Sequence, residues 1–194
     1  SDLMLPDFAP YFRPHFRDHY GLVMFIRRSI PVLAEGDTFV FRERGYIPQD
    51  EDIGRHARNL QYATLETPDG PLTVAQIHGL WNGKGKTDTD ERIEQSQRMI
   101  DVLARLPGPQ VLCGDLNLVP ESESIAMIER AGFRNLVTDF GVTSTRTSFY
   151  TKSVRHADYM FVSPSLFVES FTVLPDEVSD HAALSVEIKN TVST

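Results

Sequence analysis

Val111-Leu112-Cys113-Gly114-Asp115-Leu116-Asn117 leads from a short apolar segment into a polar turn, and the expected fold follows from this stretch. A short apolar run that ends at a glycine is typical of a buried strand. Asp115 and Asn117 would leave the sheet at the strand end, on the same side if the backbone stays extended. A carboxylate orients or deprotonates water, and an amide holds a phosphate oxygen without titrating. The motif alone fits catalysis and an Asx turn about equally well.

Ser179-Asp180-His181 precedes the apolar segment 182–188 and is a second place where polar side chains meet a strand end. An imidazole titrates near neutral pH and needs a partner that fixes its tautomer. Asp158, within His156-Ala157-Asp158-Tyr159-Met160, is the predicted partner. Because adjacent strand residues face opposite ways, a bend is required to aim Asp180 and His181 into one cleft. A surface turn with an incidental histidine fits this motif alone about as well.

His78 directly follows the apolar segment 72–77, so it too stands at a strand end. A lone histidine in such a place is more often structural than catalytic. The repeated placement of polar groups at strand ends raises the odds of function, because side chains leave a sheet for a cleft there. Carboxylates, an amide and imidazoles together suit metal-assisted attack on a phosphate ester.

The composition fits a single globular domain over residues 1–194, with 41% hydrophobic and 24% charged residues. A net charge of −8 disfavours a DNA-binding module, because such modules carry a basic surface. Cys113 is the only cysteine, so no internal disulfide can form. No apolar run approaches the roughly 18 residues of a membrane span. We expect no transmembrane segment and a cytoplasmic location; the oligomeric state is not encoded in any pattern found here.

The order of expected elements predicts mainly antiparallel sheets with helices outside them, an α/β sandwich. Apolar patterning predicts strands over 21–26, 38–41, 59–66, 72–77, 110–113, 157–162, 167–174 and 182–188. Helices are predicted over 88–106 and 121–131, the first with Asp88 and Glu91 as a capping box and with Ile93, Ile100, Leu103 and Ala104 on its apolar stripe. Prolines in residues 1–20 predict a packed loop, and residues 42–58 a surface loop.

The ordered motifs resemble those of the endonuclease/exonuclease/phosphatase superfamily, which includes deoxyribonuclease I, abasic-site endonucleases, neutral sphingomyelinases and inositol phosphatases. They are His78, Gly114-Asp115-Leu116-Asn117-Leu118-Val119-Pro120, Ala157-Asp158-Tyr159-Met160-Phe161 and Ser179-Asp180-His181. The resemblance extends from about Tyr20 to the C-terminus, and Thr87–Arg92 with Gln95 is similar to a helix start in bacterial members. It implies a four-layer α/β (α+β) sandwich and hydrolysis of a phosphodiester or phosphomonoester with Mg²⁺ or Mn²⁺.

The resemblance also implies roles for single residues. Asp115 aligns or activates the attacking water, and Asn117 supports the phosphate and that water. His181 contacts the phosphate and is oriented by Asp158, while His78 stabilises developing charge. The implied metal ligands are Asp180 and Asp115. The implied substrate is a phosphate ester, with nucleic acids and lipid head groups among the candidates.

The start of the chain departs from the family pattern. Family members begin with a strand that carries an Asn, followed by a strand that ends in Gln-Glu, whose Glu is the principal metal ligand; neither pattern is present. Residues 1–20 look like the segment that follows this Glu. We therefore expect residues 1–194 to be the C-terminal portion of the full fold, without its first two strands.

Two alternatives to a phosphoesterase remain open. The segment Gly79-Leu80-Trp81-Asn82-Gly83-Lys84-Gly85-Lys86-Thr87 lies between a strand and a helix, as a nucleotide-binding loop would. Its spacing is one residue too long for that motif, which weakens the prediction of nucleotide hydrolysis through Gly85-Lys86-Thr87. The other alternative is a non-catalytic binding domain of the same fold. The missing Glu favours this alternative, whereas the intact set of polar residues opposes it.

Overall fold

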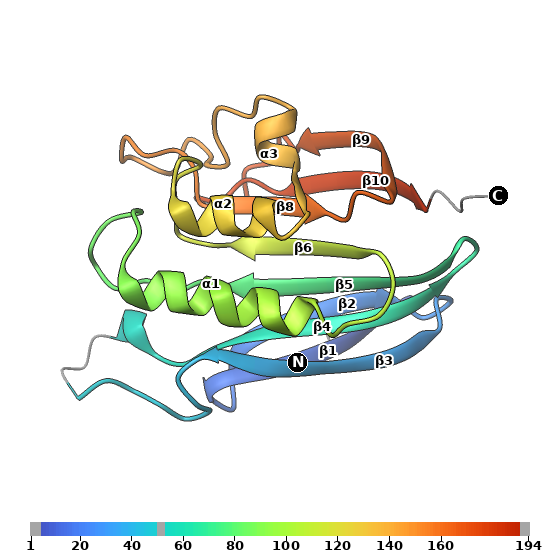
Figure 1. The fold of residues 1–194 in the computed structure, drawn as a ribbon, viewed down its shortest axis with the longest axis horizontal. Helices are drawn as coiled ribbons and strands as arrows, with labels where there is room; N and C mark the ends of the chain where they lie inside the picture. Colours follow the sequence, from blue (N-terminus) through green and yellow to red (C-terminus); the bar gives the residue numbers. More distant parts are fainter. Residues whose placement is uncertain (1–4, 50–52, 191–194) are drawn as a thin grey trace.

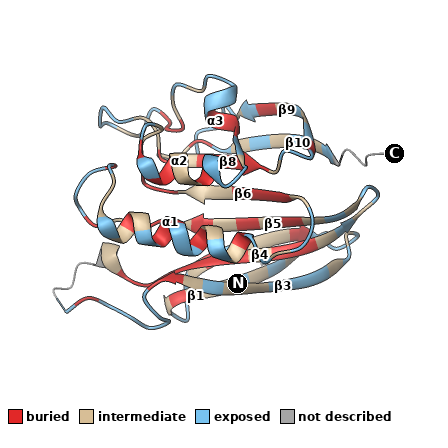
Figure 2. Ribbon diagram, in the orientation of Figure 1, coloured by how far each residue is buried: buried red, intermediate tan, exposed pale blue. Residues whose placement is uncertain are grey.

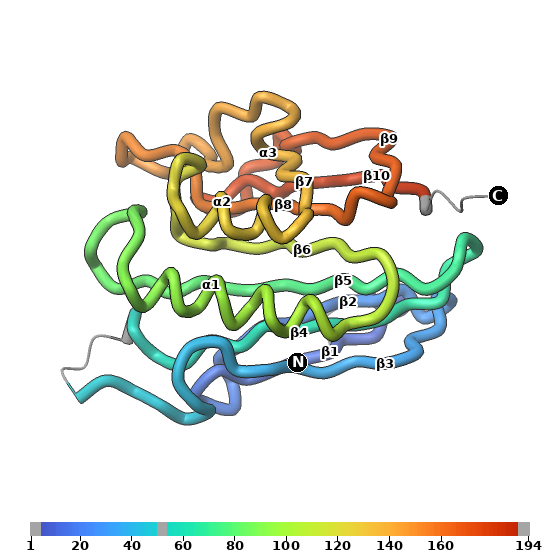
Figure 3. Tube along the Cα trace, viewed as in Figure 1, coloured from blue at the N-terminus to red at the C-terminus, as the bar shows by residue number. Residues whose placement is uncertain are grey.

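A six-stranded mixed sheet forms the centre of the fold in the computed structural model, which describes residues 5–49 and 53–190 (Figure 1). Its strand order is β3 (Val32–Phe41), β4 (Arg58–Thr67), β5 (Gly70–His78), β6 (Gln110–Asp115), β8 (Asp158–Val162) and β7 (Arg134–Asn135). Only β5 and β6 pair in parallel, and the chain between them crosses over through a helix (Figure 3). The other pairs are antiparallel, as the apolar patterning predicted.

Two helices, α1 (Asp90–Leu103) and α2 (Glu123–Arg130), lie on one face of this sheet (Figure 1). The core fills the space between them and the sheet, and the inward sides of α1, α2, β4 and β5 carry its buried residues (Figure 2). These residues include Leu60, Ala75, Ile77, Met99, Leu103, Leu112, Ile125 and Ile128. Burial of this apolar surface holds the helices on the sheet.

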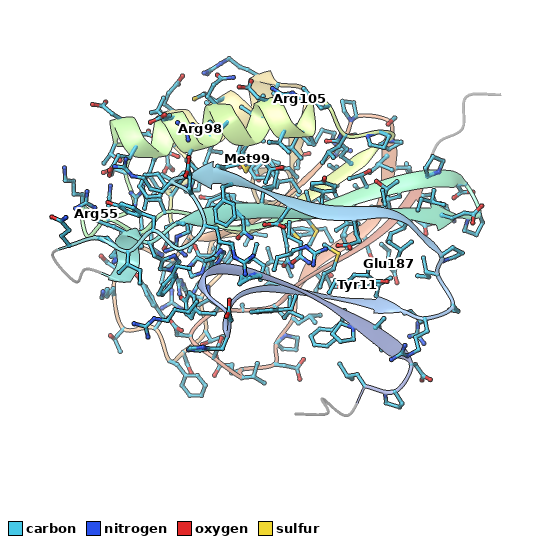
Figure 4. The ribbon with its side chains drawn as sticks, turned by 90° about the horizontal axis from the view of Figure 1, so that it is seen from below. Tyr11, Arg55, Arg98, Met99, Arg105 and Glu187 are labelled. Carbon is cyan, nitrogen blue, oxygen red and sulfur yellow. The ribbon has the colours of Figure 1, made fainter. Side chains whose placement is uncertain are left out.

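Two separate β-hairpins complete the sandwich. The first consists of β1 (Phe8–Arg17) and β2 (Tyr20–Arg27), and the second of β9 (Leu166–Val173) and β10 (Leu184–Asn190). The β1–β2 hairpin lies on the face opposite α1 (Figure 4), where Gln61 Nε2 donates to Tyr11 O at 2.8 Å and Gln76 Nε2 to Val23 O at 2.9 Å. The β9–β10 hairpin joins the core through Phe171. The predicted sandwich is confirmed: in the described residues, helices cover one face of the central sheet and the β1–β2 hairpin lies on the other.

The predicted loop at the start of the chain is wrong, because residues 8–17 form strand β1. Pro10 and Pro14 both lie in this strand, which pairs with β2 alone among the described strands. Proline lacks an N–H donor but is tolerated in an edge strand, where that position faces away from the ladder. Residues 1–4 lie outside the described part of the chain.

For most other elements the predicted type, helix or strand, agrees with the structure better than the predicted first and last residues do. Strand β3 begins at Val32, six residues before the predicted start, and the loop of residues 42–58 contains the 3₁₀ turn η1 (Ile53–Arg55). The short elements β7 and α3 (Leu136–Asp139) were not predicted. In the described residues no helix has the length and apolar character needed to cross a membrane.

The predicted capping box of α1 is wrong by one residue. Thr89 caps the helix and its side chain accepts from Arg92 N, whereas Asp88 reaches across to α2, where its carboxylate accepts from Glu123 N at 2.6 Å and Ser124 N at 3.1 Å. The buried face of α1 also differs from the predicted stripe. It consists of Arg92, Gln95, Ser96, Met99 and Leu103, while Ile93 and Ile100 are half-buried and Ala104 is exposed.

Candidate active site

Three predicted site residues lie side by side because of strand register. In the parallel β5–β6 pair His78 is opposite Asp115, and in the antiparallel β6–β8 pair Asp115 is opposite Asp158. The end of β5, the end of β6 and the start of β8 therefore meet at one edge of the sheet. Directly opposed residues have side chains on the same face, about 5 Å apart at Cβ. The topology thus assembles an imidazole and two carboxylates from segments far apart in the sequence.

The turn after β6 differs from the extended backbone that the sequence suggested. Asn117 has a φ of 56°, and its backbone N–H donates to Asp115 Oδ1 at 2.7 Å, so the Asx turn is real. The amide of Asn117 is buried and donates to Gly79 O at 3.3 Å. Gly114, with a φ of 141°, allows β6 to approach β5 closely, since a Cβ there would lie 1.9 Å from Ile77 O. Asp115 and Asn117 therefore form the turn and also belong to the candidate site.

His181 reaches this edge from the segment before β10. Its Nδ1 lies 2.8 Å and 3.0 Å from the two carboxylate oxygens of Asp158, and its Nε2 lies 3.8 Å from Asp115 Oδ2. An ionised carboxylate only accepts hydrogen bonds, so Nδ1 carries the proton and Nε2 faces Asp115. Thr145 Oγ1 donates to Asp158 Oδ2 at 3.1 Å and holds that carboxylate in place. The predicted pairing of Asp158 with His181 is present in the structure.

Burial and neighbouring charges set the protonation of these groups. Burial and the nearby carboxylate of Asp158 raise the pKa of Asp115 to about 6. The hydrogen bond to Asp158 raises the pKa of His181. Burial, with the charge of Arg58, lowers the pKa of His78 to about 3, so this ring is neutral at physiological pH. The site therefore combines a carboxyl group that titrates near neutrality with one neutral imidazole and one that is readily protonated.

Ligand atoms suitable for a divalent cation converge here. Asp115, Asp158 and His181 offer ligand atoms that all lie within 4.8 Å of one another. Carboxylate oxygens suit Mg²⁺ and Mn²⁺, and two opposed carboxylates repel each other unless positive charge lies between them. The donor set therefore fits a divalent cation. Asp180 lies outside this group, because its carboxylate is 2.9 Å from Arg146 Nη1, and its role as a metal ligand stays a prediction.

Basic residues around the site were not predicted as a group. Arg146 has a side chain only 5% exposed, binds Asp180 and lies over the ring of Tyr150. Lys86 is buried, donates to His156 O at 2.7 Å and also lies over Tyr150. Arg146 and Tyr150 fall in the segment 141–156, which lacks any periodic pattern, so only the tertiary fold identifies them.

The Gly-rich segment 79–87 does not have the environment of a nucleotide-binding loop. The ammonium group of Lys86 is held by a backbone carbonyl, and the first turn of the following helix carries Asp90 and Glu91. Acidic residues at a helix N-terminus repel phosphate, which that terminus would otherwise attract. These observations oppose the alternative of nucleotide hydrolysis through this loop.

The chain belongs to the Endonuclease/Exonuclease/phosphatase family, whose model matches residues 2–181. This match confirms the resemblance found in the sequence motifs. Members of this family are hydrolases that act on phosphate esters, and divalent metals are generally used. No curated protein matches the sequence.

Solved structures share the fold. The mannosyl-6-phosphatase of Bacteroides thetaiotaomicron has a TM-score of 0.73 at 20% identity, over 95% of this chain and 78% of that one. The human Nocturnin catalytic domain with bound sulfate has a TM-score of 0.72 at 17% identity, over 98% and 77% of the two chains. TDP2 of D. rerio, in complex with a single-strand DNA product, has a TM-score of 0.67 at 15% identity, over 95% and 78%. At these identities the likeness concerns the fold.

Proposed function

We propose that this chain is a divalent-metal-dependent phosphoesterase in which water attacks the phosphorus atom in line with the leaving oxygen. The observation that carries the proposal is the convergence of Asp115, Asp158 and His181, with His181 Nδ1 held by Asp158 and Nε2 directed at Asp115. A bound Mg²⁺ or Mn²⁺ would polarise the phosphate and lower the pKa of a bound water. Asp115 and Asp158 are the carboxylates that would hold the ion, with Asp180 as a further proposed ligand.

The chain's own residues divide the remaining work. Asp115, with a pKa of about 6, is largely ionised at pH 7.5 and accepts a hydrogen bond from the attacking water. His181, in the protonated form that its raised pKa favours, donates from Nε2 to a phosphate oxygen while Asp158 fixes its ring through Nδ1. His78 is neutral and donates to a phosphate oxygen without changing charge. Asn117, whose side-chain amide also donates to Gly79 O, would support the phosphate and the attacking water at the same edge of the sheet.

The substrate class proposed here is broad, namely phosphate esters. The structural neighbours include a mannosyl-6-phosphatase and a protein in complex with a single-strand DNA product, so the shared fold is compatible with both small and polymeric substrates. The net charge of −8 weakens the case for non-specific nucleic-acid binding. We propose a phosphomonoester or phosphodiester, with nucleic acids and lipid head groups as the further candidates.

The proposal predicts hydrolysis that depends on added divalent metal. The chain, freed of metal with EDTA, is assayed for release of nitrophenol from p-nitrophenyl phosphate and bis-p-nitrophenyl phosphate, and then with Mg²⁺ or Mn²⁺ restored. Hydrolysis of at least one ester should return with metal, and ATP should not be hydrolysed faster than these esters. Failure of both ions to bind or to restore hydrolysis would favour the non-catalytic binding domain.

A further inference from the structure

A cavity of about 400 Å³ adjoins the reaction edge of the sheet. Aromatic side chains of Phe16, Tyr20 and Trp81 form part of its wall, and the rings of Phe16, Tyr20 and His56 contact one another with centroids 4.4 to 5.3 Å apart. His78 and Asn117 also line it. The cavity therefore shares two residues with the proposed reaction site and lies next to it.

Arg58 lies at this cavity with most of its donors unused. The residue is 1% exposed, and its Nη2 donates to Gly54 O at 2.9 Å. Its Nε and Nη1 have no hydrogen-bond partner among the described residues. Burial of unpaired charged donors is costly, so proteins normally satisfy such groups with a partner, an ion or a ligand.

The described side chains that line the Arg58 cavity include positive but no negative charges, although the protein is acidic. Arg17 lines the cavity too, and no Asp or Glu belongs to the described residues that do so. Burial lowers the pKa of Arg58 to about 10, while Asp115 of the neighbouring reaction site acts in the opposite direction, and Arg58 is charged at neutral pH. Its charge in turn contributes to the lowered pKa values of His56 and His78. A buried cation with free N–H groups and no acidic partner in its cavity is the arrangement that binds an oxyanion.

We propose that the Arg58 cavity binds a second phosphate group of the substrate, so that the preferred substrates carry two phosphates. One phosphate is hydrolysed at Asp115 and His181, and the other is bound by the free guanidinium donors of Arg58. This inference rests on the proposed function. The aromatic wall favours a carbon skeleton between the two phosphates over a fully hydrated linker.

The first test compares binding of matched ligands to the unaltered full chain. Calorimetry with EDTA present measures the affinities of propane-1,3-diol, butane-1,4-diol and pentane-1,5-diol bisphosphates against the corresponding alkyl monophosphates. At least one bisphosphate should bind about tenfold or more tightly than its monophosphate, the contribution expected of charged hydrogen bonds. Equal affinities across the whole series would overturn the proposal.

The second test assigns the preference to Arg58. Arg58→Gln should lose about tenfold or more in affinity for the preferred bisphosphate and for inorganic phosphate, whereas Arg105→Gln, on an exposed residue of the same type (Figure 4), should not. Circular dichroism shows whether Arg58→Gln folds; if it does not, Arg58→Lys, which keeps the charge, replaces it and should weaken the bisphosphate preference. An unchanged preference in the folded variant would contradict the proposal.

Hydrolysis separates this inference from the proposed function. With Mg²⁺ or Mn²⁺, the chain should hydrolyse the preferred bisphosphate with a kcat/KM about tenfold or more above that of the monophosphate. Hydrolysis of both with equal kcat/KM, together with equal binding, would overturn the second phosphate site and leave the phosphoesterase standing. A bisphosphate binding preference without any hydrolysis would support the site and count against the phosphoesterase.

Discussion

Asp115 and Asp158 face each other across the β6–β8 ladder, a pairing that like charges normally disfavour. The structure offsets this repulsion in part with His181, whose imidazole lies between them and whose pKa the Asp158 hydrogen bond raises. His181 does not cancel the whole effect, so burial and repulsion from Asp158 still raise the pKa of Asp115. A divalent cation bound beside the two carboxylates would remove more of this cost, which is why the cluster supports a metal-dependent reaction.

Removal of the carboxylate partner should lower the pKa of His181. Asp158→Asn keeps the size of the side chain but loses the charge that favours the imidazolium form, so the pKa of His181 should fall by about one unit or more. NMR titration of the imidazole signal in metal-free protein measures this, with Asp176→Asn, on an exposed loop residue, as the control. An unchanged pKa of His181 in Asp158→Asn would mean that Asp158 does not stabilise the protonated ring.

The residues of the proposed reaction centre were predictable because each lies beside an apolar strand segment. His78, Asp115 and Asp158 stand where strands begin or end, and their meeting follows from register alone. Arg58 was not predictable. It begins β4 within a polar stretch, and only the fold shows that it is buried. Its unused donors are a property of packing and leave no trace in the local sequence.

Helices α1 and α2 are linked because a residue just before α1 caps the N-terminus of α2. Asp88 precedes α1, but its carboxylate accepts two N–H groups at the start of α2, where Ser122 makes no side-chain cap. The first N–H groups of a helix have no partner within the helix, so an acceptor there is stabilising. Asp88 thereby fixes the position of the Gly-rich segment 79–87 relative to α2.

Loss of this cap should destabilise the protein without altering the site. Asp88→Ala should lower the free energy of unfolding by about 1 kcal/mol, a typical cost of removing a helix cap. Urea unfolding at pH 7 measures the change, and Asp176→Ala serves as the exposed control. A loss equal to that of the control would show that the cap contributes nothing.

Strands with regular alternation were predictable, whereas the elements that depend on distant partners were not. β5 alternates clearly between buried and half-buried residues, and the strands predicted over 59–66 and 72–77 lie within two residues of the observed bounds of β4 and β5. β1 carries two prolines that argue against a strand unless its one-sided pairing is known. The α1 face was mispredicted because polar side chains such as Arg92 and Gln95 are buried by contacts with the Gly79–Thr87 segment, including Leu80.

For the whole molecule, the sandwich buries a cluster of neutral histidines between the β1–β2 hairpin and the central sheet. The rings of His15 and His56 have centroids 5.3 Å apart, and those of His15 and His78 are 6.3 Å apart. His15 Nδ1 donates to Asn59 Oδ1, which ties the hairpin to β4. The single-domain and cytoplasmic predictions stay predictions.

This cluster should make the fold sensitive to mild acid. Burial and Arg58 lower the pKa values of His15 and His56 from 6.5 to about 4. Between pH 6.5 and 4 the unfolded chain binds protons at these rings while the folded chain does not, so the stability present at pH 7 falls as the pH is lowered. The loss approaches about 3 kcal/mol per histidine.

Urea unfolding at pH 7 and pH 4.5 measures this loss, and His15→Gln should make the decline shallower because one of the titrating rings is removed. Carboxylates also contribute to acid sensitivity. The informative quantity is therefore the difference between wild type and His15→Gln in the slope of the unfolding free energy against pH. Identical slopes for wild type and His15→Gln would show that the hairpin does not hold its histidine neutral.

The central claim, that the cluster at the edge of the sheet is the reaction centre, is tested most directly by turnover of Asp115→Asn. The substitution keeps the shape of the side chain but removes the base, so kcat for the metal-restored ester hydrolysis should fall by about 10²- to 10⁴-fold with the fold intact. Asp176→Asn should keep wild-type turnover. Near-wild-type turnover by a folded Asp115→Asn protein would contradict the account.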